Sequence, residues 1–101
     1  MARKSSKSTA MVVSGVLYTD DDWTGTQVNS LAWSFFLKEG RTFYCDLGDA
    51  SYTARPEKRR EGFFWYGYKK VRGKLLKRYI GRAQDVTINR LVEVGKSFIQ
   101  V

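Results

Sequence analysis

The residues of this sequence best suited to binding chemistry are its lysines and arginines, and most of them lie between residues 55 and 82. Eleven lysines and arginines occur there against two acids, Glu57 and Glu61, so this segment carries +9 and leaves −1 for the rest of the chain. Aromatic residues interrupt the cations in residues 63–82, which read FFWYGYKKVRGKLLKRYIGR. Cations bind phosphates and flat rings bind sugars or bases, so this concentration predicts a polyanionic partner.

Histidine and pairs of cysteines, which many catalytic and metal sites use, are absent from the sequence. The sequence has no histidine and one cysteine, Cys45, so it offers no zinc site and no Ser-His or Cys-His pair. Its glycines lack the spacing of a phosphate-binding loop. Asp20-Asp21-Asp22 is better explained as a solvated acidic turn than as a cation site. We therefore expect no enzymatic activity, no metal and no cofactor, and we expect Cys45 to be a buried thiol.

The composition is that of one small globular domain. The chain has 101 residues, 43% hydrophobic and 28% charged, which predicts a single core. Nothing resembles a secretory signal or an apolar span of membrane length, so we expect a cytoplasmic protein without membrane association. Residues 1–10 predict a disordered basic tail, and residues 11–101 predict a single α+β domain.

Strand-forming residues and turn signals predict the elements that carry the basic segment. A first strand is expected within residues 11–19 and four more near 42–47, 50–55, 62–71 and 74–81. Leu47-Gly48-Asp49 predicts one turn, and residues 56–61 predict a charged loop at one end of the sheet. These strands are expected to pair antiparallel, and the sequence leaves open whether the first one joins the main sheet.

Helical periodicity predicts two helices. The first has an apolar stripe of Val28, Leu31, Ala32, Phe35 and Phe36, widened by Trp33 and Leu37, with Thr26 or Asn29 as its cap and Gly40 at its end. The second follows Thr87 and presents Ile88, Leu91, Val92, Gly95, Phe98 and Ile99 on one side. The predicted fold is therefore α+β: an antiparallel sheet of three to four strands with helices packed on one face.

Arg72-Gly73 predicts a two-residue hairpin turn, and this turn decides which residues share a face. Paired residue numbers then sum to 145, with Tyr66 opposite Tyr79 and Trp65 opposite Ile80. The face predicted to build the core carries Trp65, Gly67, Leu76 and Ile80, and also Lys69 and Arg78, with Arg78 at its rim. The face predicted to be exposed carries Phe64, Tyr66, Tyr68, Lys70, Leu75, Lys77 and Tyr79.

An exposed basic and aromatic sheet face predicts binding of double-stranded DNA, because β-ribbons fit the major groove. The candidate binding residues are Arg55, Lys58, Arg59, Arg60, Tyr66, Tyr68, Lys70, Arg72, Lys74, Lys77, Arg78 and Tyr79. RNA is a second candidate ligand. The alternative is a protein-interaction module, a small inhibitor or adaptor whose basic face binds an acidic or nucleic-acid-binding surface of a partner. The sequence leaves the oligomeric state open.

Several segments resemble a small bacterial domain that occurs alone, at the N-terminus of LuxR/MalT-type regulators, and in plasmid or phage proteins. The resemblance lies in LAWSFFL at 31–37, SYTARPEKRREG at 51–62, residues 63–82, and DVTINRLVEVG at 85–95. That family implies no firm activity. It does suggest an accessory or regulatory protein of a mobile element, plasmid or phage.

Two looser resemblances concern nucleic acids. A three-stranded sheet followed by a helix, with Trp65 and Tyr79-Ile80-Gly81, is similar to arm-type DNA-binding domains of tyrosine recombinases, which lay the sheet in the major groove. That likeness implies that Tyr66, Tyr68, Lys70, Lys77 and Tyr79 face DNA. Tyr68, Tyr79-Ile80-Gly81 and Arg90 also look like the opening of a GIY-YIG nuclease. However, Tyr66 replaces that family's first glycine, and Glu93 is too close to Arg90 to be its metal-binding glutamate.

Overall fold

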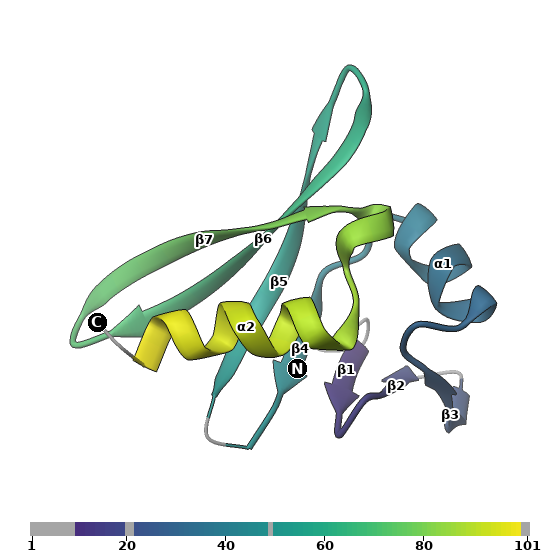
Figure 1. The fold of residues 1–101 in the computed structure, drawn as a ribbon, viewed down its shortest axis with the longest axis horizontal. Helices are drawn as coiled ribbons and strands as arrows, with labels where there is room; N and C mark the ends of the chain where they lie inside the picture. The colour runs from purple at the N-terminus through teal and green to yellow at the C-terminus, as the bar shows by residue number, and fades with distance from the viewer. Residues whose placement is uncertain (1–9, 20–21, 49, 100–101) are drawn as a thin grey trace, which may run out of the picture.

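Seven strands form one sheet in the order β3-β2-β1-β4-β5-β6-β7, and two helices pack against it (Figure 1). The computed structural model describes residues 10–19, 22–48 and 50–99. The elements are β1 Ala10–Val13, β2 Val16–Thr19, β3 Asp22–Gln27, α1 Leu31–Lys38, β4 Phe43–Asp46, β5 Ser51–Arg59, β6 Gly62–Val71, β7 Lys74–Arg82, the short 3-10 helix η2 Ala83–Asp85, and α2 Ile88–Ile99.

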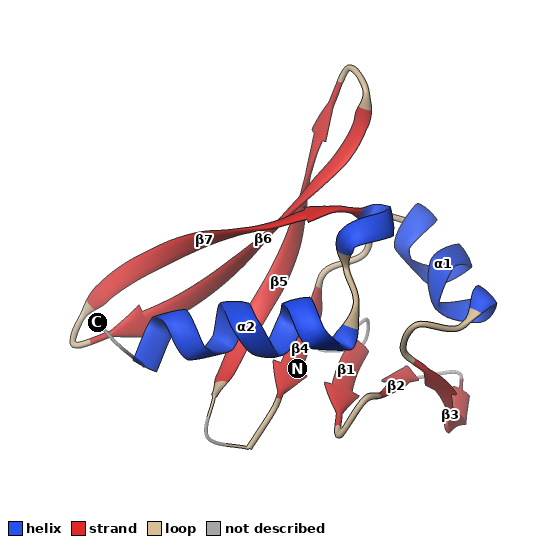
Figure 2. Cartoon of the chain, in the orientation of Figure 1, coloured by secondary structure: helices blue, strands red, loops and turns tan. Residues whose placement is uncertain are grey.

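The predicted α+β class is confirmed, but the predicted sheet is too small and its pairing is not wholly antiparallel. β1 lies parallel to β4, whereas the other neighbouring strands are antiparallel. The parallel pair is possible because β2, β3 and α1 connect the two strands (Figure 2). The first strand therefore does join the main sheet.

Residues 11–19, predicted as one strand, form the β1–β2 hairpin. Ser14 and Gly15 make its turn with φ of 53° and 80°, the positive values that a tight two-residue hairpin turn needs at both positions. Ala10 is buried in β1. The rest of the predicted tail, residues 1–9, and Asp20 and Asp21 of the predicted acidic turn lie outside the described residues.

β5 is longer than predicted and replaces most of the expected charged loop. It runs to Arg59, so only Arg60 and Glu61 connect it to β6. Its pairing with β4 ends at Ala54, whereas its pairing with β6 continues to Arg59. Pro56 therefore lies where β5 has become an edge strand, the place in a sheet where a missing backbone N–H is tolerated.

The first helix buries only part of the predicted apolar face. Trp33, Phe36 and Leu37 are buried, whereas Leu31 and Phe35 are 73% and 57% exposed. The helix begins at Leu31 after its cap Ser30, whose hydroxyl accepts from the Trp33 N–H at 3.3 Å. The predicted stripe counted from Val28, which precedes the helix, so Val28 and Phe36 are buried as predicted, whereas Leu31, Ala32 and Phe35 are exposed.

The predicted caps for the first helix have other roles. Thr26 lies in β3, and the Asn29 side chain accepts from the Ile88 N–H at 3.0 Å, at the start of α2. The Thr87 hydroxyl accepts from the Arg90 N–H at 3.2 Å, so the predicted cap of α2 is confirmed. Asn29 and Thr87 therefore both satisfy free N–H groups of the first turn of α2.

The core lies between the helices and one face of the sheet. An aromatic chain of Trp33, Phe36, Phe43 and Trp65 joins α1 to β4 and β6, with ring centroids 5.3–5.9 Å apart. α2 contributes Leu91, Val94, Gly95 and Phe98 to the same core, and it contacts β6 and β7. No helix in the described part of the chain is long and apolar enough to cross a membrane.

Candidate nucleic-acid interface

The register of the β6–β7 hairpin confirms six predicted pairs and corrects one. Pairing runs as predicted from Val71 and Lys74 to Tyr66 and Tyr79, with positive φ at both turn residues, Arg72 (52°) and Gly73 (83°). Beyond Tyr66 the register shifts, so Trp65 lies opposite Gly81 and not Ile80. Ile80 is the extra residue of a β-bulge, and it is nevertheless buried.

Arg90 of α2 binds the strand at this bulge. Its Nε donates to the carbonyl of Ile80 and its Nη2 to the carbonyl of Tyr79, both at 2.8 Å, while Nη1 pairs with Glu93 at 2.9 Å. β7 is an edge strand, so these carbonyls have no neighbouring strand to bind them. The arginine singled out by the nuclease resemblance therefore has its guanidinium occupied by backbone oxygens and Glu93.

The predicted division of the hairpin into two faces is confirmed. Trp65, Gly67 and Ile80 are buried and face the helices, and Leu76 packs against the same core. A Cβ added to Gly67 would lie 2.9 Å from the Tyr52 ring and 3.3 Å from Val94 of α2, so this glycine does permit a close approach of the helix layer. The opposite residues lie on the side of the sheet that α1 and α2 leave uncovered.

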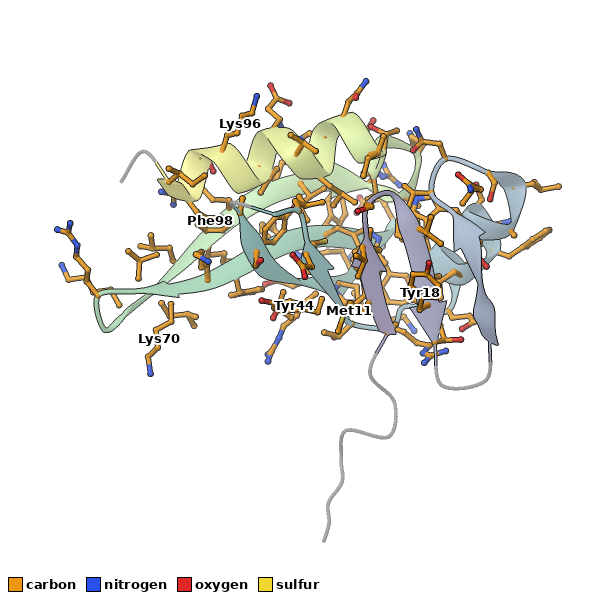
Figure 3. All side chains as sticks on the ribbon, turned by 90° about the horizontal axis from the view of Figure 1, so that it is seen from below. Met11, Tyr18, Tyr44, Lys70, Lys96 and Phe98 are labelled. Atoms are coloured by element: carbon orange, nitrogen blue, oxygen red, sulfur yellow. The ribbon has the colours of Figure 1, made fainter. Side chains whose placement is uncertain are left out.

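This uncovered side, here called the open face, extends beyond the hairpin. Figure 3 shows the sheet from its edge, with α2 on one side and Lys70, Tyr44, Met11 and Tyr18 on the other. The pairing of β1, β2, β4 and β5 adds residues that the sequence analysis did not place there. The open face includes Met11, Tyr18, Tyr44, Thr53, Arg55, Glu57, Arg59, Phe64, Tyr66, Tyr68, Lys70, Leu75, Lys77, Tyr79 and Arg82, and at the ends of β1, β2, β4 and β5 also Val13, Val16, Asp46 and Ser51.

An acidic residue lies among the cations of the open face. Glu57 Oε2 lies 2.6 Å from Lys77 Nζ and Oε1 lies 3.0 Å from Arg59 Nη2, and the Tyr68 hydroxyl donates to Oε2 at 3.1 Å. The hydrogen bond from Lys77, followed by that from Arg59, lowers the pKa of Glu57 to about 2. The same carboxylate raises the pKa values of Lys77 and Arg59. Two predicted phosphate ligands are therefore already ion-paired.

Aromatic rings hold the cations of the open face in place. Lys77 Nζ lies 4.3 Å from the centre of the Tyr66 ring, and the Tyr66 and Tyr79 rings are 5.3 Å apart. The guanidinium of Arg55 lies 5.6 Å from the Tyr68 ring. Arg59 of β5 and Arg82 of β7 lie 5.6 and 5.2 Å from the Phe64 ring of β6. Cation–π contacts of this kind orient long side chains that would otherwise be mobile.

The outer half of the β6–β7 hairpin has a different character. β5 pairs with β6 only as far as Thr53 and Tyr68, so residues 69–76 form a two-stranded ribbon, here called the arm, which projects from the sheet (Figure 1). The arm contains Lys69, Lys70, Arg72 and Lys74 and no acidic residue. Lys69 Nζ donates to the Ser51 carbonyl at 2.6 Å and ties the base of the arm to β5.

The twelve candidate residues thus fall into three groups. Seven lie on the open face: Arg55, Arg59, Tyr66, Tyr68, Lys70, Lys77 and Tyr79. Arg60, Arg72 and Lys74 are exposed at the two hairpin turns. Lys58 and Arg78 point to the helix side, and Arg78 lies 5.5 Å from the Phe98 ring, at the core rim where it was predicted. Sequence reasoning missed Glu57, Arg82 and Tyr44.

No family model, no curated protein and no solved structure matches the chain. Within the described residues, no group of three or more histidine, cysteine and acidic side chains is placed to hold a metal ion. The chemistry of the site is therefore that of its own residues. It has cations held by aromatic rings and ion pairs, and a basic two-stranded ribbon that projects from the sheet.

Proposed function

We propose that this protein binds double-stranded DNA without catalysing a reaction, with the arm in the major groove and the adjacent open face against the phosphate backbone. The arm is the observation that carries the proposal. It is a two-stranded ribbon with four cations and no carboxylate, and a two-stranded ribbon is an element that the major groove admits.

The dimensions favour the arm over the whole sheet as the element that enters the groove. Neighbouring strands lie about 4.8 Å apart, so seven strands span about 29 Å, whereas the major groove is about 12 Å wide. The arm has only two strands. The rest of the open face would then meet the backbone beside the groove, where Arg55 and Arg82 are available for phosphates.

Charge sets the expected strength of binding and its dependence on salt. Each phosphate contact contributes about −0.9 to the slope of log K against log salt concentration. Four arm cations therefore predict a slope of about −3.6, and contacts by the open face would make it steeper. A-form RNA has a narrow, deep major groove, so duplex RNA should compete poorly if the arm enters the groove.

The test is fluorescence anisotropy with a labelled DNA duplex over a series of salt concentrations. The variant Lys70→Ala/Lys74→Ala removes two cations from the arm, and Lys38→Ala/Lys96→Ala removes two from the helix layer, where Figure 3 shows Lys96 on the far side from Lys70. We expect the arm variant to flatten the slope by about 2 and to weaken binding at least tenfold. The helix-layer variant should stay close to the wild type.

Two outcomes contradict this proposal. Equal losses in the two variants would show that net charge, and not the arm, determines binding. A wild-type protein that does not bind duplex DNA at about 50 mM salt would exclude the DNA hypothesis, because contacts of this number are strong at low ionic strength. We propose that the protein acts as an accessory or regulatory factor of a mobile element, plasmid or phage, as its sequence resemblance implies, and that it does so in the cytoplasm.

One feature of the open face favours the alternative, a protein-interaction module. Leu75 is 67% exposed and Met11 36% exposed, beside tyrosines and cations. Aliphatic side chains add little to a phosphate contact, whereas methionine, tyrosine and arginine are enriched at protein interfaces. In that case the open face would bind an acidic or nucleic-acid-binding surface of a partner, and Leu75→Ala would weaken binding as much as Lys70→Ala.

A further inference from the structure

A recess of about 330 Å³ opens at the base of the arm, on the open face. It is lined by Thr53 and Arg55 of β5, Tyr68, Lys69 and Lys70 of β6, and Leu75 of β7. Its size lies at the lower end of the range of small-molecule sites, about 300–1,000 Å³, and far above the volume of a single water molecule, about 30 Å³. A phosphate group alone would leave most of it unfilled.

The lining combines two kinds of chemistry. Arg55 and Lys70 supply two positive charges from the open face, and the Thr53 hydroxyl can donate or accept a hydrogen bond. Lys69 belongs to the helix side of β6, and its ammonium is bound to the Ser51 carbonyl. Leu75, 67% exposed, and the ring of Tyr68 supply apolar surface. A ligand that carries a negative charge next to a group with an apolar flat face satisfies both, and a nucleotide is such a ligand.

Three of the lining side chains have partners of their own in the structure. The Lys69 ammonium is held by the Ser51 carbonyl at 2.6 Å, and the Tyr68 hydroxyl is held by Glu57 at 3.1 Å. The guanidinium of Arg55 lies 5.6 Å from the Tyr68 ring. Three of the six lining side chains are therefore oriented before any ligand arrives, which reduces the entropy lost on binding.

We infer that this recess binds one unpaired nucleotide of DNA, with its base against Leu75 and Tyr68 and its phosphate between Arg55 and Lys70. The inference rests on the proposed function, because the recess lies beside the arm that would occupy the groove. A base inside a continuous duplex is stacked and cannot enter such a site without being extruded, which costs the stacking and pairing of that base. The protein should therefore prefer a duplex that contains an unpaired nucleotide.

Two duplexes of the same sequence test this inference, one continuous and one with a single bulged 2-aminopurine nucleotide. We expect the wild-type protein to bind the bulged duplex at least fivefold more tightly and to change the 2-aminopurine fluorescence. Leu75→Ala should reduce the preference, measured as the ratio of the two affinities, below twofold, whether or not it also weakens binding of the continuous duplex. Leu31→Ala is the matched control, an equally exposed leucine on α1 that should preserve the preference.

A second titration separates failure of this inference from failure of the proposed function. It uses 2-aminopurine deoxyribonucleoside monophosphate alone, which needs no duplex. Equal affinity for the two duplexes, or a preference that Leu75→Ala does not change, would overturn the inference and leave duplex binding intact. Saturable binding of the nucleotide, lost in Leu75→Ala, without binding of either duplex would overturn the proposed function and retain the recess as a nucleotide site.

Discussion

Replacing Glu57 by glutamine should strengthen DNA binding. In the folded protein this carboxylate lies 2.6 Å from Lys77 Nζ and 3.0 Å from Arg59 Nη2, so it neutralises cations that would otherwise be free for phosphates. Glutamine keeps the size of the side chain and removes its charge. Each released cation that contacts a phosphate should make the salt slope steeper by about 0.9 and tighten binding about eightfold at 0.1 M salt. With two candidates, the expected change in slope is about 1 to 2.

The matched control is Glu93→Gln. It removes the same charge from the exposed surface of α2, where Glu93 pairs with Arg90 at 2.9 Å, on the side of the sheet opposite the open face. Anisotropy titrations of both variants over a salt series measure the slopes directly. A slope and an affinity that match the wild type in Glu57→Gln would refute the reasoning. Weaker binding would also refute it, and would show that the carboxylate contacts the ligand itself, as an acceptor for cytosine N4 for example.

The low pKa of Glu57 allows a second test of its ion pairs with Lys77 and Arg59, through the pH dependence of the free energy of unfolding. Its pKa of about 2 lies below the ordinary value of 4.5, so the stabilisation from its charged form is complete above about pH 4.5 and is lost as the pH falls toward 2. Urea unfolding of the wild type and of Glu57→Gln should therefore differ most at neutral pH and converge near pH 2. The difference should be small throughout, because solvent-exposed ion pairs contribute little. A difference in the free energy of unfolding between the wild type and Glu57→Gln that grows as the pH falls would contradict the assigned ion pairs.

Three further predictions test the fold. Trp33→Phe should destabilise the protein by about 1–3 kcal/mol more than Trp65→Phe in urea unfolding, because Trp33 Nε1 donates to the buried Val86 carbonyl at 2.8 Å, whereas Trp65 Nε1 has no partner among the described residues. Gly67→Ala should cost about 1–3 kcal/mol, since its Cβ would lie 2.9 Å from the Tyr52 ring. Burial raises the pKa of Cys45 to about 12, so its thiol should not react with a thiol reagent at pH 8 until the protein unfolds.

The β6–β7 hairpin could be predicted from the sequence because its signals are local. Arg72-Gly73 marks the turn, and alternation on each side assigns Trp65 and Tyr66 to opposite faces. The bulge at Ile80 could not be predicted in this way. It is fixed by Arg90, ten residues further along the chain, whose guanidinium binds the two carbonyls at the register shift.

Two of the remaining differences between the predicted and the observed structure also arise from contacts between residues far apart in the sequence. The parallel pairing of β1 with β4 depends on a long connection and leaves no local pattern. The ion pair of Glu57 with Lys77 joins residues twenty positions apart, on strands that are not neighbours in the sheet. Ser14-Gly15 was a missed local signal, since a serine–glycine pair between two apolar runs is typical of a hairpin turn.

The large sheet explains how a chain of 101 residues can support a projecting arm. The arm itself contributes little to the core, since Lys70, Arg72, Lys74 and Leu75 are all exposed. Its strands are long because β6 and β7 continue into the buried half of the sheet, where Trp65 and Ile80 pack beneath the helices. A two-stranded ribbon alone is marginally stable in water. The strands β1 to β4, which add no cation of their own to the open face, thus enlarge the core that holds the arm in place.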